Sequence, residues 1–152
     1  MSLDFDRDVR VALYQRWTET GAAPSRADLA VWLRCEETEI AAAFERLAEQ
    51  RIVVLEPHSR ELWMAMPFSA FPTAFRVTAR GQTYFANCAW DALGFAPMLG
   101  CDATIETVCA DCGEPETIEI VNGRLRIEGG SETGVVHFAI PAAEWWEDIG
   151  FT

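Results

Sequence analysis

The chain has 152 residues and a mass of 17.0 kDa, which suits one domain of ordinary size or two small ones that share an interface. Half of the residues are hydrophobic, so a sizeable core is available and disorder is excluded. No apolar run reaches the ~18 residues that cross a bilayer, and the acidic residues 1–6 lack the basic and apolar regions of a secretory signal. We therefore expect a soluble, cytoplasmic protein without a membrane partner.

The charge balance excludes a further class of partner. All 12 basic residues are arginines, and they stand against 24 Asp and Glu, which gives a net charge of −12. The excess is larger in residues 66–152 than in residues 1–65. Phosphate backbones and anionic headgroups repel so acidic a chain, and we expect no nucleic-acid partner.

The first 66 residues predict three helices and a β-hairpin. Apolar residues at four-residue spacing indicate a helix over residues 4–19. Ser25 as N-cap, with Asp28 at the third helical position, begins a second helix that runs to about residue 34. A third helix over residues 37–50 buries Ile40, Phe44, Leu47 and Ala48. Strands at residues 52–55 and 61–66, around a turn at 57–59, complete the element order of a winged helix.

A winged helix often reads DNA with its third helix, but this one is acidic. The helix carries Glu36, Glu37, Glu39, Glu45 and Glu49 against only Arg46 and Arg51. A structural or lid-forming role is favoured. A winged-helix regulator that senses a thiophilic ligand stays open as an alternative, and it would need a basic face on this helix.

The rest of the chain predicts a small β-rich body. Residues 67–76 form a connector punctuated by prolines, and residues 77–152 form the body. Strands are expected at residues 75–79, 83–85, 103–108, 116–121, 124–128 and 134–140, a helix from residue 87 or 88 to residue 93, and a loop over residues 94–100. Asn122-Gly123 is a two-residue hairpin turn. The predicted fold class is α+β, with a winged-helix-like module of three helices and a β-hairpin packed on a small mixed α/β body.

Cys88 and Asp91 are the most informative pair of side chains. A helix that begins near residue 88 would place both on one face of its first turn. The helix N-terminus should lower the pKa of the Cys88 thiol, while the neighbouring Asp91 charge opposes that effect, so the two groups can share a proton. Such a pair combines a soft nucleophile with a proton donor. The alternative is a buried cysteine beside a carboxylate that only favours the helix dipole.

The other cysteines support weaker hypotheses. Five cysteines make an odd number, and the cytosol would keep them reduced. Cys109 and Cys112 have C-x-x-C spacing, which suits a metal, but a zinc site needs four ligands and only Cys101 and His137 could complete it. We expect Cys35 to be structural, His137 to be an ordinary strand residue, and the Trp145-Trp146 pair to pack on the body.

Three segments together resemble the organomercurial (alkylmercury) lyase family: Pro67-Phe68-Ser69-Ala70, Asn87-Cys88-Ala89-Trp90-Asp91-Ala92-Leu93, and Leu99-Gly100 with Asp102-Ala103. The resemblance covers most of the chain and is tightest over residues 67–109. The family also carries a winged-helix-like N-terminal region that is not used on DNA.

The resemblance implies an enzyme that cleaves carbon–mercury bonds by protonolysis, giving a hydrocarbon and Hg(II), as in mercury resistance. Cys88 would capture mercury as a thiolate, and Asp91 would protonate the leaving carbon and help to hold the metal. The partners would be an organomercurial and cellular thiols, with Hg(II) bound as product and no cofactor. We expect Cys88 and Asp91 in a pocket between the N-terminal module and the body.

One feature of the family lies at the end of the sequence. The family uses a second active-site cysteine, which would follow a segment resembling residues 145–152. Either a C-terminal extension supplies it, or the protein is a mercury or soft-metal binder with weakened catalysis. The family also has a structural cysteine near the position of Cys109, so the resemblance implies that Cys109 is structural. We expect Cys112 to be an exposed turn thiol that could relay mercury.

Overall fold

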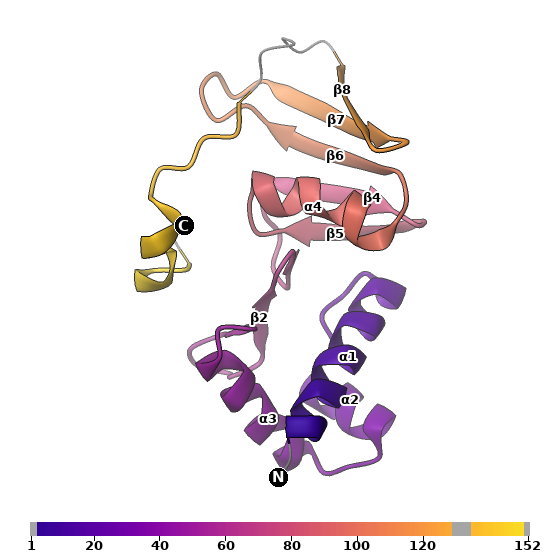
Figure 1. Ribbon diagram of the computed structural model, residues 1–152, viewed down its shortest axis with the longest axis vertical. Helices are drawn as coiled ribbons and strands as arrows, with labels where there is room; N and C mark the ends of the chain where they lie inside the picture. The colour runs from indigo at the N-terminus through magenta and orange to yellow at the C-terminus, as the bar shows by residue number, and fades with distance from the viewer. Residues whose placement is uncertain (1–2, 129–134, 151–152) are drawn as a thin grey trace.

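A computed structural model describes residues 3–128 and 135–150 of the chain (Figure 1). The helices are α1 (Leu3–Thr20), α2 (Arg26–Leu33), α3 (Glu37–Glu49) and α4 (Ala89–Leu99), followed by the 3-10 helix η1 (Ala142–Glu147). The strands are β1 (Val54–Leu55), β2 (Leu62–Ala65), β3 (Phe68–Ser69), β4 (Phe75–Ala79), β5 (Gln82–Ala86), β6 (Ala103–Val108), β7 (Pro115–Val121) and β8 (Arg124–Glu128). The α+β fold class is confirmed.

The three N-terminal helices form where the sequence predicts them. Ser25 caps α2, and its side chain and that of Asp28 exchange hydrogen bonds with each other's backbone N–H groups, which is the expected capping box. Helix α3 buries Ile40, Phe44 and Leu47, while Ala48 is only partly buried. The β1–β2 hairpin follows, so the element order is that of a winged helix, and the assignment to that module stays a prediction.

One antiparallel sheet runs through the whole molecule in the order β1-β2-β3-β5-β4-β6-β7-β8. Strand β3 lies within the expected connector and pairs with both β2 and β5, so the connector joins the hairpin to the larger strands. The hairpin turn at Asn122-Gly123 is as predicted, and a second tight turn of the same kind joins β4 to β5. Arg80-Gly81 and Asn122-Gly123 each have two consecutive positive φ angles, which the type I′ hairpin turn requires.

Phe68 of β3 lies at the centre of the core. Its ring is fully buried and stacks on Trp17 of α1 at 5.0 Å between ring centroids. It also meets Tyr84 of β5 and Phe95 of α4 edge to face, at 5.4 and 5.0 Å. A single side chain thereby connects the N-terminal helices, the sheet and α4, which Figure 1 shows lying over β4 and β5.

Helix α4 is longer than predicted, and the expectation of a loop over residues 94–100 is wrong. The helix continues through Gly94 and Pro97 to Leu99, and Gly100 ends it with a left-handed conformation. Phe95, Ala96 and Leu99 are buried against the sheet. Tertiary burial of this apolar face therefore outweighs the low helix propensity of glycine and proline.

The last predicted strand is also wrong. Residues 135–140 form no strand, and Gly134 lies outside the described residues. Val135, Val136 and Phe138 keep exposed surface, so the β-branched sequence has no partner strand to pack against. The segment leads instead to η1, where the ring of Trp146 lies 5.4 Å from the Arg51 guanidinium. Beyond η1, Gly150 lies against Trp63. The C-terminal segment thus returns to the N-terminal module (Figure 1).

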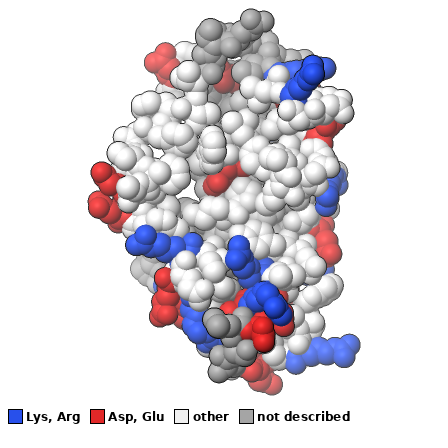
Figure 2. Space-filling view, viewed as in Figure 1, with Lys and Arg blue, Asp and Glu red and all other residues white. Residues whose placement is uncertain are grey.

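Charged side chains gather over the N-terminal module, and Figure 2 shows both signs interleaved there beneath a mostly uncharged upper face. Its arginines are largely paired. Arg46 of α3 binds the buried Asp6, and Arg60 binds Glu45, while Arg26 binds Glu61 at 2.7 Å. The one arginine of α3, Arg46, is thus engaged by Asp6. Among the described residues, no helix combines the length and apolar composition of a bilayer crossing.

Candidate active site

Cys88 lies at the junction between β5 and α4. It is the N-cap of α4, one residue earlier than the predicted first turn, with an extended backbone at φ −150°. Its Sγ accepts a hydrogen bond from the backbone N–H of Asp91 at 3.5 Å, as an N-cap side chain does. The sulfur is half-buried and is held at the positive end of the helix dipole.

Asp91 lies one turn into α4, and its carboxyl group is held by Asn87. The Asn87 side-chain amide donates to Asp91 Oδ2 at 2.9 Å and to the Phe68 carbonyl at 3.2 Å. Asn87 Oδ1 is buried without a partner among the described residues, so it remains an acceptor for a ligand or a water molecule. Sequence and structure therefore agree that Cys88 and Asp91 share one turn.

The electrostatics of the pair differ from the prediction. Burial raises the pKa of the Cys88 thiol, and the Asp91 charge adds to that rise, while the N–H groups of Asp91 and Trp90 lower it only in part. The predicted lowering is wrong because the helix N-terminus is outweighed by desolvation. Burial likewise raises the pKa of Asp91, which the Asn87 hydrogen bond opposes. Burial thus raises the pKa of both groups, and they lie close enough together for the Asp91 charge to act on the Cys88 thiol.

A cavity of about 270 Å³ opens beside Cys88. Phe75 of β4 and residues 87–90 form one wall, and the C-terminal segment forms the other through residues 136–140 and Trp145. No residue of the N-terminal module lines it, so the prediction of a pocket between module and body is wrong for Cys88. The segment that was predicted as a strand instead covers the thiol.

An apolar cavity of about 560 Å³ adjoins the first and shares Trp90, Phe138 and Trp145 with it. The three rings pack in series, with Phe138 lying 6.2 Å from Trp90 and 5.4 Å from Trp145 between centroids. Trp90 keeps 61% of its surface exposed. The aromatic wall can hold an uncharged organic group next to the thiol.

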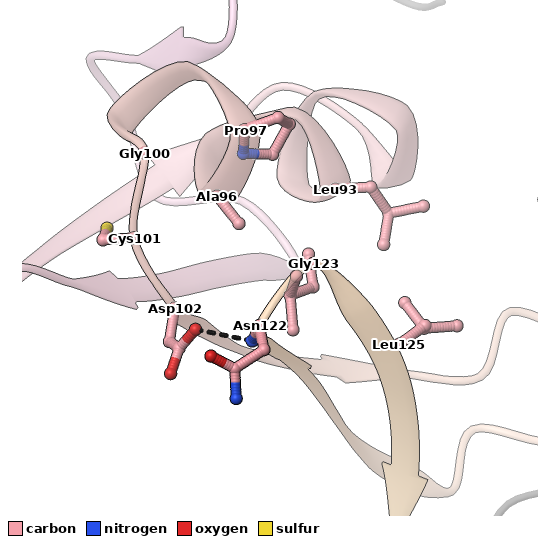
Figure 3. A pocket seen from close by; sticks show the side chains of 10 residues that line it. Leu93, Ala96, Pro97, Gly100, Cys101, Asp102, Asn122, Gly123 and Leu125 are labelled. Carbon is pink, nitrogen blue, oxygen red and sulfur yellow. Dashed lines mark hydrogen bonds between the residues drawn. The ribbon is translucent and has the colours of Figure 1, made fainter.

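A larger cavity, of about 610 Å³, lies at the opposite end of α4 (Figure 3). It includes Cys101, and in it the Asn122 backbone N–H donates to Asp102 Oδ1 at 2.8 Å. Although Leu93 also lines this cavity, the length of α4 places Cys101 about 18 Å from Cys88, at the rise of an α-helix. Cys101 therefore does not reach Cys88.

The remaining predicted ligands also stay apart. Cys109 and Cys112 lie together in the β6–β7 connection, where hydrogen bonds from the N–H groups of Cys112 and Asp111 lower the pKa of Cys109. His137 lines the Cys88 cavity and is not a strand residue. The half-buried Cys35 lies between α2 and α3. Among the described residues no three His, Cys, Asp or Glu side chains form a metal-binding group, so nothing supports the zinc hypothesis.

Two residues near the site escaped the sequence analysis. Asn87 directly precedes the predicted helix, but its contact with Asp91 depends on the bend of the chain at Cys88. Tyr14 of α1 donates to the Met66 carbonyl at 3.0 Å. Burial raises the pKa of Tyr14 and the Asp91 charge adds to that increase, which places Asp91 near α1. A contact between residues so distant in sequence leaves no local signal.

Comparison with known proteins separates the N-terminal module from the rest of the chain. The family model of the alkylmercury lyase MerB matches residues 68–152, which include β3 to β8, α4 and the cavity beside Cys88. The chain belongs to the alkylmercury lyase family. A search of curated proteins finds no matching relative.

Among solved structures, the chain resembles one described as the mercury-bound form of MerB2. The TM-score is 0.64 at 23% sequence identity, and the match covers 84% of this chain. It covers 61% of the other chain, so this chain spans less than two thirds of that protein. At this identity the likeness concerns the fold.

Proposed function

We propose that the protein cleaves carbon–mercury bonds by protonolysis, with Cys88 as the mercury-binding thiol and Asp91 as the proton carrier. The observation that supports this most strongly is their placement in one turn of α4, where the Asp91 N–H donates to Cys88 Sγ within a half-buried site. The family match supports the chemistry, since it includes this turn.

The first step would be the exchange of a proton for mercury on Cys88. Because the pKa of the thiol is raised, Cys88 binds as S–H, and its proton passes to the Asp91 carboxylate as the S–Hg bond forms. The bond between mercury and its second ligand, a small thiolate or a halide, breaks at the same time, and that ligand leaves as an anion. Mercury is a soft ion that prefers thiolate ligands, so the exchange is favourable. The aromatic wall of Trp90, Phe138 and Trp145 would hold the organic group beside the sulfur.

The second step would return that proton to carbon. The electron pair of the C–Hg bond takes the proton from the Asp91 carboxylic acid, a C–H bond forms, and Hg(II) stays on sulfur without a change in oxidation state. A second thiolate from the cellular pool would complete the coordination of mercury. The raised pKa of Asp91 suits the first step, because the carboxylate of a weaker acid is a stronger base and accepts the thiol proton more readily.

A second candidate is a mercury or soft-metal binder that does not turn over. The observation in its favour is that Cys88 is the one cysteine lining its cavity among the described residues. With a single thiolate the C–Hg bond gains less electron density, and protonation of carbon slows.

One assay separates the two candidates. The chain is incubated with phenylmercury and an excess of a small thiol, and benzene is followed by gas chromatography. A lyase releases benzene, and Cys88→Ala and Asp91→Asn lose that release, while Cys35→Ala keeps it because Cys35 lies between α2 and α3. Mercury bound through Cys88 without benzene would instead identify the binder. If the chain neither releases benzene nor binds mercury, both candidates are overturned.

A further inference from the structure

The connection between β6 and β7 is a tight loop that holds two thiols. The Cys109 N–H donates to the Glu114 carbonyl at 2.8 Å, and the Gly113 N–H donates to the Cys109 carbonyl at 2.8 Å. Gly113 has a φ of +75°, which lets the loop close immediately after Cys112. The backbone thus fixes both ends of the C-x-x-C segment.

The loop also orients the two sulfur atoms toward each other. The Cys109 thiol accepts hydrogen bonds from the N–H groups of Asp111 and Cys112, and it contacts the Cys112 thiol. Both cysteines are free, with Cys109 half-buried and Cys112 exposed. The charge of Glu116 acts on Cys109 and that of Glu114 acts on Cys112, and Asp111 lies between the two cysteines in the sequence, so the loop favours a cation over an anion.

The number of ligands in the loop determines which metals it can bind. No third His, Cys, Asp or Glu joins the two thiols in a metal-binding group within the described parts of the chain. Zinc needs four ligands, whereas Hg(II) and other soft ions bind tightly to two thiolates. The dithiol therefore suits a soft ion in two-fold coordination.

The strand register places this loop near the candidate active site. Phe75 of β4 pairs with Ala86 at the end of β5, and the next residue, Arg76, pairs with Glu106 near the end of β6. Cys88 and Cys109 therefore follow strands that end at the same side of the sheet, two strand spacings or about 10 Å apart across β4.

We propose that Cys109 and Cys112 form a second mercury site, a dithiol that binds Hg(II) between its two sulfur atoms and lies within reach of Cys88. On binding, each thiol releases one proton, two S–Hg bonds form, and the two ligands that carried the mercury leave, with no oxidation or reduction. Its use as the acceptor of mercury released at Cys88 rests on the proposed function, whereas the binding of Hg(II) does not.

The test uses mercuric chloride and the full chain with Cys88→Ser, so that mercury on the candidate active site does not contribute. The protein is loaded with mercury, challenged with increasing amounts of a small monothiol and desalted, and the retained mercury is measured by elemental analysis. Cys88→Ser/Cys112→Ser and Cys88→Ser/Cys109→Ser remove one sulfur each. Cys88→Ser/Cys101→Ser is the matched control, because Cys101 lies at the far end of α4.

We expect Cys88→Ser and the Cys101 control to retain mercury equally. Loss of either loop thiol should lower the monothiol concentration that strips the metal by at least about tenfold, because a second thiol on a short loop acts at millimolar or higher effective concentration. Equal retention with and without Cys112, or equal loss in the Cys101 control, would overturn the proposal. Failure of the proposed function would appear separately, as no benzene from the unmodified chain, and would leave this retention unchanged.

Discussion

Asn87 holds the carboxyl group of Asp91 through a hydrogen bond of 2.9 Å while its second amide hydrogen binds the Phe68 carbonyl. The amide thereby ties the proposed proton carrier to β3, the strand that also carries the central ring of the core. Because the donor stabilises the charged carboxylate, it opposes the effect of burial on the pKa of Asp91.

Replacing Asn87 should therefore move the pH dependence of benzene release. In Asn87→Ala the pKa of Asp91 rises further, and the acidic limb of the kcat/KM profile moves to higher pH, since the carboxylate must be ionised to accept the thiol proton. Gln82→Ala is the matched control, because the Gln82 side-chain amide likewise donates to a backbone carbonyl of another element, that of Glu19 in α1, but away from Cys88. An unmoved acidic limb in Asn87→Ala would contradict the role of Asp91.

How far the sequence predicts this molecule depends on whether a signal is local. The capping box of Ser25 and Asp28 and the turn at Asn122-Gly123 are determined by adjacent residues, and both were predicted correctly. The path of residues 135–140 was predicted wrongly as a strand, because a β-branched segment becomes a strand only where a partner strand is available. The length of α4 depended on burial of Phe95 and Leu99 against a sheet that the sequence does not show.

In the candidate site, too, the features with a local sequence signal were predicted and the others were missed. Cys88 and Asp91 were found from their spacing and from a resemblance, and the structure places them in one turn of α4. The direction of the Cys88 pKa was missed, because the helix N-terminus is visible in the sequence and the burial of the sulfur is not. Tyr14 and Asn87 were missed because their partners lie on other elements or beyond a bend of the chain.

Phe68→Ala should be the most destabilising core substitution described here. The ring contacts aromatic side chains of α1, β5 and α4, so its removal leaves a cavity at the centre of the molecule. We expect a loss of about 3–5 kcal/mol in the free energy of unfolding, measured by urea denaturation. Phe71→Ala, which removes a ring that is 49% exposed, should cost less than about 1 kcal/mol. Equal losses would contradict the central position of Phe68.

Asp6 should make stability depend on acid. The Arg46 guanidinium donates two hydrogen bonds to this buried carboxylate, at 2.6 and 2.8 Å, and lowers its pKa. A lowered pKa stabilises the fold above the unfolded-state value of about 3.9, and that contribution disappears as pH falls through the lower folded-state value.

Asp6→Asn should therefore lose about 1–3 kcal/mol of unfolding free energy at neutral pH and should show a flatter decline in stability below pH ~4. Thermal unfolding followed by circular dichroism over a pH series measures both effects. Asp4→Asn, whose partner Arg7 is exposed, should change stability by less than about 0.5 kcal/mol. An Asp6→Asn protein with unchanged acid sensitivity would show that this pair does not govern it.

Gly150→Ala should release the C-terminal segment from the N-terminal module. A Cβ at this position would lie 2.6 Å from Cη2 of Trp63, so the indole or the segment must move. We expect higher amide exchange in η1 and a changed Trp63 environment in hydrogen-exchange and fluorescence measurements. Gly94→Ala, with open space around its Cβ in α4, should instead stabilise the protein by about 0.5–1 kcal/mol. Unchanged exchange in η1 would argue against the contact.

The central claim is that Cys88 holds mercury while Asp91 supplies the proton to carbon. Intact mass spectrometry of Asp91→Asn after incubation with one equivalent of phenylmercury tests it most directly. In a Cys109→Ser/Cys112→Ser background, which removes the loop dithiol, the account predicts an Asp91→Asn adduct that keeps both mercury and the phenyl group and that is lost when Cys88→Ser is added. With Asp91 in place, the same background retains mercury without phenyl. Loss of the phenyl group from Asp91→Asn at the rate of the unmodified chain would contradict it.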